Sequence, residues 1–199
     1  MANVSGGIDE NLAGEGNPVL AFLQERRSCH ELTGPAPSAG HVEQILRAAL
    51  RVPDFGRLRP YRFLLAKEEG LDRLGQAIAR AAVAAGKSEK VIARAPSMPH
   101  RAPLVIVVVA CPREDKTVPA FDQQLCAAST VLTMQLAARA LGYGGLWRSG
   151  WMMYDRGFHR ELDLAETEQI VGFLYLGTPA ETNEEAPADP SPDGFVAWL

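Results

Sequence analysis

Apolar and polar positions follow one another along the chain in a pattern that predicts helices interleaved with strands. The dipeptide Asn-Pro at 17–18 is a typical helix start, because Asn caps free backbone N–H groups and Pro is tolerated in the first turn. The apolar residues that follow predict that this helix continues to about Ser28, with Arg26 and Arg27 in its last turn. A second helix is predicted over 39–52, where a serine precedes apolar residues at helical spacing.

Four stretches have the composition of strands. Residues 104–111 and 169–177 are continuous apolar runs, which are typical of strands buried on both faces. Residues 61–68 and 144–150 are less apolar, and we interpret them as two further strands. The chain therefore supplies enough strands for one central sheet.

The other regular segments have apolar residues at helical spacing, and they lie at 69–86, 87–95, 118–141 and 155–162. The segment 118–141 is small and apolar almost all round, which predicts a central and buried helix. Helices and strands alternate from one end of the chain to the other. This order predicts a layered α/β or α+β domain.

Composition narrows the possible functions. The chain has 199 residues, of which 47% are apolar and 22% charged, as in an ordinary globular domain. A formal net charge of −4 provides no global basic field for nucleic acid. No apolar run reaches the ~20 residues of a membrane span, and the N-terminus lacks a signal-peptide pattern.

Cysteine and histidine positions indicate no metal site. The three cysteines, Cys29, Cys111 and Cys126, form no C-x-x-C pair, so neither zinc nor a disulfide framework is indicated, and a reducing cytoplasm is expected. The four histidines have no metal-ligand spacing, and we expect each of them at the surface or in a turn.

Familiar nucleotide and hydrolase motifs do not occur. The stretch "GYGGLW" at 142–147 fails the G-x-G-x-x-G pattern and stands after a helix and before a strand, the reverse of a dinucleotide fold. No P-loop is present. Ser149 is not part of a G-x-S-x-G turn, and no Asp or His partner can be identified for it.

Arginines beside serines remain as candidate chemistry. "RRS" at 26–28 and "WRS" at 147–149 each set a guanidinium beside a hydroxyl, and Arg51 is a third cation. The first pair alone is explained by cations at a helix end. Arg148, inside an apolar strand, is harder to explain in that way, and guanidinium forks bind phosphate bidentately. With Phe55 and the tryptophan of "WRS" as flat apolar surfaces, the combination suits FMN, on which a nicotinamide could stack.

The order of several segments resembles the nitroreductase-like flavoproteins. These segments are "ERRS", "RAALRVPDFGRLRPYRF", "RAPLVIVVVA", "ALGYGGLWRSG" and "IVGFLYLGTP". The resemblance spans roughly 19–179 and is strongest to the small NAD(P)H nitroreductases of bacteria. It implies an α+β fold with a central mixed or antiparallel sheet flanked by helices. It also implies an FMN-binding homodimer of interlocked subunits, with active sites at the interface.

Residue roles are implied by the same resemblance. Arg26, Arg27 and Ser28 would reach the phosphate, ribityl chain and pyrimidine edge of FMN. Arg51 and Phe55 would come from the other subunit, and Trp147, Arg148 and Ser149 would form the last FMN segment. The stretch implied for NAD(P) consists of Ala137, Ala138, Arg139, Ala140, Leu141 and Gly142. We expect no protein catalytic residue and no metal ligand, because FMN carries the chemistry; Arg27 is the candidate that stabilises the reduced flavin.

The chain departs from the family pattern at several positions. Phe55 stands where close relatives often have His, Arg59 where Gln is common, and Tyr61 where Trp is common. Many members also place a basic phosphate ligand near the C-terminus, whereas this chain has no Lys or Arg after Arg160. The phosphate charge would then be met by Arg26, Arg51 or Arg148.

The expected function is that of an FMN-dependent oxidoreductase, a flavoprotein that passes electrons from NADH or NADPH to a nitro compound, quinone or similar small acceptor. Two alternatives stay open: a non-catalytic module that stores or senses flavin, and a reduced-flavin enzyme of another reaction type. Three regions are predicted: a disordered leader at 1–16, the FMN-binding domain at 17–179 and an extension at 180–199. The apolar end of this extension is expected to pack on the partner subunit.

Overall fold

The computed structural model describes residues 17–180 and 191–199, and the chain divides into two compact units. Ser28–Ala180 is the larger unit and holds the whole β-sheet. Residues 17–27 and 191–199 belong to the other unit, which is described separately. The predicted leader, 1–16, and most of the predicted extension lie outside the described residues.

The sheet of the larger unit is antiparallel throughout. Its strands are β1 (Leu32–Thr33), β2 (Tyr61–Lys67), β3 (Leu104–Ala110), β4 (Gly144–Arg148) and β5 (Gln169–Pro179). Their order is β1-β5-β3-β2, and β4 also pairs with β5. The four predicted strands are confirmed as β2, β3, β4 and β5. The strand β1 was not predicted, because two residues are too short to produce a sequence period.

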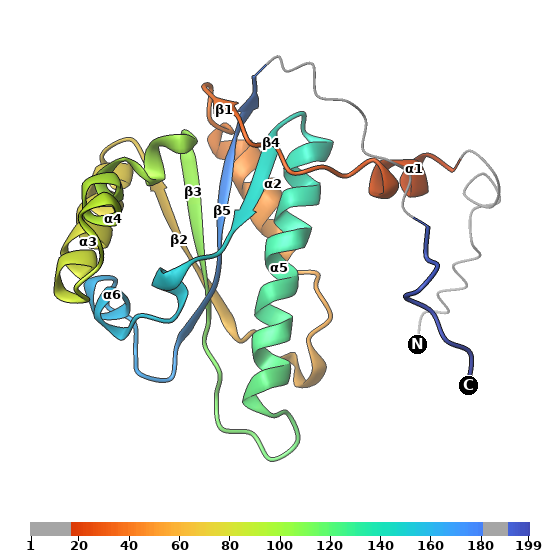
Figure 1. The fold of residues 1–199 in the computed structure, drawn as a ribbon. Coiled ribbons are helices and arrows are strands. Elements are labelled where there is room, and N and C mark those ends of the chain that lie inside the picture. Colours follow the sequence, from red (N-terminus) through yellow and green to blue (C-terminus); the bar gives the residue numbers. More distant parts are fainter. Residues whose placement is uncertain (1–16, 181–190) are drawn as a thin grey trace. The chain divides into compact units, whose positions relative to one another are not determined.

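Helices cover both faces of the sheet (Figure 1). On one side lie α3 (Glu69–Ala84), α4 (Glu89–Arg94) and α6 (Arg156–Glu161), and on the other lie α2 (Ala39–Ala49) and α5 (Ala120–Ala140). Every residue of β3 is buried, because alternate side chains enter the two cores. The structure therefore confirms the α+β class and the buried apolar run.

The prediction of a fully buried α5 holds for one face only. Val131 and Met134 are buried against α2 and the sheet. Phe121, Leu125 and Leu132, in contrast, are 66%, 51% and 43% exposed. These three side chains recur at helical spacing, so they form one apolar stripe on the outside of α5.

The first helix, α1 (Pro18–Gln24), begins as predicted but ends early. The side chain of Asn17 accepts hydrogen bonds from the backbone N–H groups of Val19 and Leu20. No basic residue lies in the last turn of α1. Arg26 and Arg27 follow the helix, so the expectation that they lie in its last turn is wrong. None of the described helices is long and apolar enough to cross a membrane.

Candidate functional site

The chain after the first arginine cluster runs beside β4. The backbone N–H of Cys29 donates to the carbonyl of Gly145 at 3.0 Å. A Cβ on Gly144 would lie only 3.0 Å from the sulfur of Cys29, so glycine permits this close approach. Ser28 is thus held near β4, which carries Trp147 and Arg148. Of the first predicted FMN segment, only Ser28 belongs to the larger unit, and its neighbour Cys29 is tied to β4.

Trp147 and Arg148 point to opposite faces of the sheet, as successive strand residues do. The indole of Trp147 lies across Gly172 of β5, where a Cβ would overlap the indole Nε1. Trp147 is 38% exposed, so its ring also offers an accessible apolar surface. Glycine at 172 therefore permits the indole to lie against β5.

Arg148 lies on the α3 side with a donor that has no acceptor. Its Nε is buried and makes no hydrogen bond, and its guanidinium lies 5.5 Å from the ring centroid of Tyr175. Burial lowers the pKa of Arg148, and the positive charge of Arg101 lowers it further. A buried donor without an acceptor costs free energy. An anion at this position would remove that cost.

The loop after α2 presents Phe55. The carboxylate of Asp54 accepts hydrogen bonds from the backbone N–H groups of Leu58 at 3.1 Å and Arg59 at 2.8 Å, which closes the loop. Arg57 and Arg59 adopt positive φ angles of 54° and 46°, a region that is costly for residues other than glycine. These strained backbone angles give the loop a shape in which the side chain of Phe55 is 73% exposed.

Phe55 also borders a hollow of about 250 Å³. Its other walls come from the loop and from the first half of α5, including Leu125 and Cys126. Within the described residues, no hydrogen bond, ion pair or ring contact joins Arg51 or Phe55 to β4. One subunit therefore does not bring these two segments into contact, and the expectation that the loop serves the other subunit's site stays a prediction.

The stretch predicted for NAD(P) forms the end of α5 and the turn after it. Ala138 is fully buried and Ala137 packs against the same core. Gly142 has a φ of 86°, which suits glycine after a helix end. Ala140 and Gly142 are exposed, so they are the members best placed to contact a dinucleotide.

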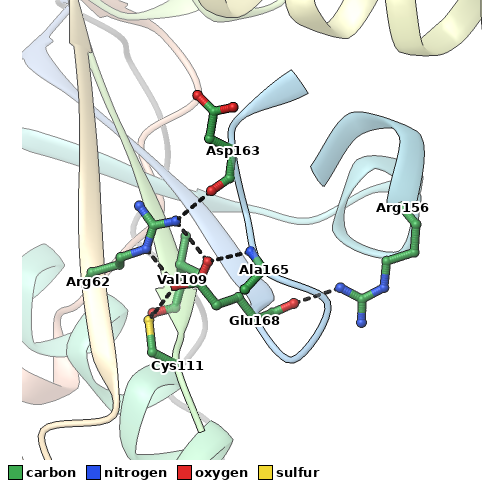
Figure 2. Close-up of polar contacts among 7 residues, drawn as sticks. All are labelled: Arg62, Val109, Cys111, Arg156, Asp163, Ala165 and Glu168. Atoms are coloured by element: carbon green, nitrogen blue, oxygen red, sulfur yellow. Dashed lines mark hydrogen bonds and ion pairs between the residues drawn. The ribbon is translucent and has the colours of Figure 1, made fainter. Parts of the chain in front are cut away.

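A separate polar cluster links the end of β3 to the start of β5 (Figure 2). Arg62 donates from Nε and Nη2 to the two carboxylate oxygens of Glu168, at 2.7 and 2.8 Å. The thiol of Cys111 donates to the same carboxylate at 3.1 Å. The hydrogen bonds from Arg62 hold the pKa of Glu168 at about 2, and burial raises the pKa of Cys111 to about 12. Because this thiol stays protonated, the cluster does not supply a nucleophile.

His159 does not lie at the surface or in a turn, as the sequence had indicated. It belongs to α6 and is 1% exposed. Its Nε2 donates to the carbonyl of Met153 at 3.1 Å, and its Nδ1 accepts from Arg156 at 2.8 Å. Burial, followed by the charge of Arg156, lowers the pKa of His159. The imidazole therefore has a structural role as a neutral ring.

The larger unit thus offers donors and flat surfaces that fit a phosphorylated aromatic cofactor. The fit rests on the orphaned Nε of Arg148 and on the exposed rings of Phe55 and Trp147. Arg26 and Arg27 belong to the other unit, so their part in the site remains a prediction. Sequence reasoning missed Arg101 and Tyr175, because the first stands in a proline-rich segment and the second inside an apolar run.

Comparisons with known proteins agree on one family. A model of the Nitroreductase family matches residues 23–178. The Escherichia coli (strain K12) protein named "Putative NAD(P)H nitroreductase YdjA" is 41% identical over 184 residues, which cover 91% of this chain and 99% of that protein.

Solved structures show the same fold. The nitroreductase-like family protein of Bacillus cereus has a TM-score of 0.79 and 21% identity, with 94% of this chain and 98% of that chain covered. The Bacteroides fragilis nitroreductase, solved with bound FMN, has a TM-score of 0.70 and 21% identity, with 92% and 99% covered.

Proposed function

Because the chain belongs to the nitroreductase family, we propose that it binds FMN and passes electrons from NAD(P)H to a small acceptor. Bound FMN would supply the redox chemistry itself, taking a hydride from the nicotinamide and reducing a nitro compound, a quinone or a similar molecule. The chain's own residues would bind and orient the cofactor, shield it from water and compensate its charge.

One observation carries the proposal: β4 ends in an accessible indole and a guanidinium whose buried Nε has no acceptor. The FMN-bound relative of the same fold supports FMN as the group that meets them. Because Trp147 and Arg148 lie on opposite faces of β4, FMN would reach both around the end of the strand, with Trp147 against its flat ring and Arg148 donating to an anionic oxygen. Ser28, held beside β4 by the Cys29 hydrogen bond, would add a hydroxyl.

A measurement of electron transfer distinguishes this function from the two alternatives, a flavin store and a reduced-flavin enzyme of another reaction type. The purified protein is supplied with FMN, and NADH or NADPH consumption is followed with and without a quinone or nitroaromatic acceptor. Sustained, acceptor-dependent consumption is expected. A flavin store would bind FMN without turnover, and an enzyme of another reaction type would give a product other than the reduced acceptor.

Replacing Arg27 with alanine should weaken flavin retention or slow its reduction while leaving the fold intact. The reason is that Arg27 would supply a cation beside the pyrimidine edge, where negative charge develops on reduction. FMN affinity and the rate of reduction by NAD(P)H are the quantities to compare with Lys116→Ala, a control that removes the same charge from an exposed loop. Unchanged flavin content and an unchanged rate of flavin reduction in Arg27→Ala would contradict this role of Arg27.

Assembly as a homodimer is part of the proposal, and the outside of α5 supports it. Phe121, Leu125 and Leu132 form an exposed apolar stripe there, and Leu50 at the end of α2 is 54% exposed as well. Such patches mark association surfaces. A second copy docked on this stripe would approach Phe55 through the hollow that Leu125 lines. The apolar end of the chain, 195–199, would add contacts to the partner.

Replacing Leu125 with glutamate should shift the protein towards monomer and weaken FMN binding at least about tenfold, because a charge would be buried in the interface and the partner's loop would be lost. Light scattering and FMN titration measure the two effects. Val83→Glu is the matched control, since Val83 is a 61% exposed apolar residue on α3. A dimeric Leu125→Glu protein with normal FMN affinity would contradict this interface.

A further inference from the structure

On the α3 side of the sheet, the positive charges of Arg101 and Arg148 affect the pKa of Tyr175. Arg148 ends β4, and Arg101 ends the short 3-10 helix η4 (Pro99–Arg101), which leads into β3. Tyr175 of β5 lies under the guanidinium of Arg148 at 5.5 Å. The hydroxyl of Tyr175 donates to the carbonyl of Met98 at 3.3 Å, which ties the ring to the segment that carries Arg101. Arg101 stands three residues after Met98, so this hydrogen bond holds the segment that carries Arg101 beside the ring that Arg148 covers.

Among the described residues, the charges of this pair are uncompensated. Burial raises the pKa of Tyr175, and the positive charges of Arg148 and Arg101 oppose that rise. The charge of Arg101 also adds to burial in lowering the pKa of Arg148. Across residues 17–180 and 191–199, no carboxylate forms an ion pair with either arginine. Two cations held together beside a tyrosine ring are unfavourable until an anion joins them.

The anion that fits best is a phosphate group. Guanidinium groups bind phosphate oxygens through paired donors, and two arginines together match its double negative charge. The buried Nε of Arg148 provides a directed donor that no protein group uses. Residues 161–199 contain no Lys or Arg, whereas Arg101 and Arg148 both precede this stretch.

We propose that Arg101 and Arg148 form a phosphate-binding pair over Tyr175, in which Arg101 provides the basic group that the C-terminal part of the chain lacks. The proposal rests on the function proposed above, because that function brings two phosphate-bearing molecules to the protein. One source is the phosphate of FMN, and the other is a phosphate of NAD(P)H. Arg101 is a positioning residue, since it holds the ligand by its phosphate and not at the reacting atoms.

The test compares ligands that differ by their phosphate. Dissociation constants of FMN and riboflavin are measured by flavin fluorescence for the natural protein and for Arg101→Gln. Loss of a charge-assisted contact should weaken FMN about 10- to 100-fold and leave riboflavin unchanged. Arg101→Lys should recover part of the FMN affinity. If the phosphate belongs to the nicotinamide nucleotide, FMN affinity stays constant and the KM for NADH or NADPH rises while kcat is retained.

A third experiment measures thermal stability and requires no flavin. Inorganic pyrophosphate should raise the melting temperature of the natural protein, and Arg101→Gln should reduce this rise. Arg94→Gln, which removes an exposed cation from α4, is the charge-matched control and should behave like the natural protein. If FMN fails to bind but the pyrophosphate effect depends on Arg101, the phosphate pair stands and the proposed function falls. Equal responses of Arg101→Gln and Arg94→Gln to FMN, NAD(P)H and pyrophosphate would overturn the pair.

Discussion

Replacement of Glu168 by alanine should lower the free energy of unfolding by about 3 kcal/mol at neutral pH. Only 13% of the Glu168 side chain is exposed, and its carboxylate accepts both hydrogen bonds from Arg62. It also accepts from the thiol of Cys111 and from the backbone N–H of Ala165 at 2.9 Å (Figure 2). Alanine would remove the acceptor of Arg62 Nε and of the Ala165 N–H. It would leave Arg62 Nη2 and the Cys111 thiol only their longer contacts to the carbonyls of Asp163 and Val109, at 3.5 and 3.8 Å. Urea denaturation measures the loss.

The ion pair of Arg80 and Glu161 provides the matched control. Its Nε–Oε2 distance is 2.8 Å, but its side chains are 58% and 31% exposed. Because water screens such a pair, Glu161→Ala should cost less than about 1 kcal/mol. Equal losses of unfolding free energy in Glu161→Ala and Glu168→Ala would show that the cluster at Glu168 stabilises the fold no more than an exposed ion pair does.

The stabilisation by Glu168 should depend on pH. Hydrogen bonds from Arg62 lower the pKa of Glu168 from 4.5 to about 2 in the folded chain. A lowered pKa means that the unfolded chain takes up the proton first, so this contribution is complete above pH 4.5 and is lost as the pH falls towards 2. The difference in unfolding free energy between the natural protein and Glu168→Ala should therefore shrink over this interval. A difference in unfolding free energy that stays constant over this interval would contradict the lowered pKa of Glu168.

Replacement of Gly172 by alanine should displace Trp147, lower stability by about 1–3 kcal/mol and weaken FMN binding at least about tenfold. A Cβ at this position would overlap the indole Nε1 and stand 2.9 Å from the indole Cδ1, so ring or strand must move. Gly150→Ala is the control, because the nearest atom to its Cβ would be the methyl carbon of Met152 at 3.7 Å. Stability and FMN affinity are measured together.

A double variant shows whether the clash with the indole is the cause. Trp147→Ala alone should weaken FMN binding, because it removes the flat surface. In the Trp147→Ala background, Gly172→Ala should cost little stability, because the indole that it would strike is gone. If Gly172→Ala destabilises both backgrounds equally, the effect arises from the strand and not from the position of Trp147.

The pattern of the sequence predicts most of the fold, because long elements carry strong periods. The apolar run at 104–111 leaves few positions for β3 other than the centre of a sheet, and the structure confirms it. The strand β1 has two residues and is defined only by its partners in β5, so no local pattern could reveal it. The early end of α1 escaped prediction for a similar reason, since polar residues after Gln24 fit both a helix and a loop.

The sequence identifies candidate site residues where the chemical groups lie next to one another along the chain. "WRS" at 147–149 indicates a guanidinium beside an aromatic ring, and the strand β4 places the two on opposite faces. Arg101 and Tyr175 are separated by nearly half the length of the unit and come near Arg148 only through the pairing of β3, β4 and β5. A contact that depends on the pairing of three strands produces no characteristic spacing in the sequence, so it could not be predicted.

The most direct measurement for the central claim is an anaerobic titration of the FMN-loaded protein with NADH and with NADPH, followed by visible absorbance. Stoichiometric uptake of FMN and loss of the oxidised-flavin absorbance on addition of at least one nicotinamide are predicted. Protein that stays colourless when FMN is supplied, or bound flavin that neither nicotinamide reduces, would contradict an FMN-dependent oxidoreductase.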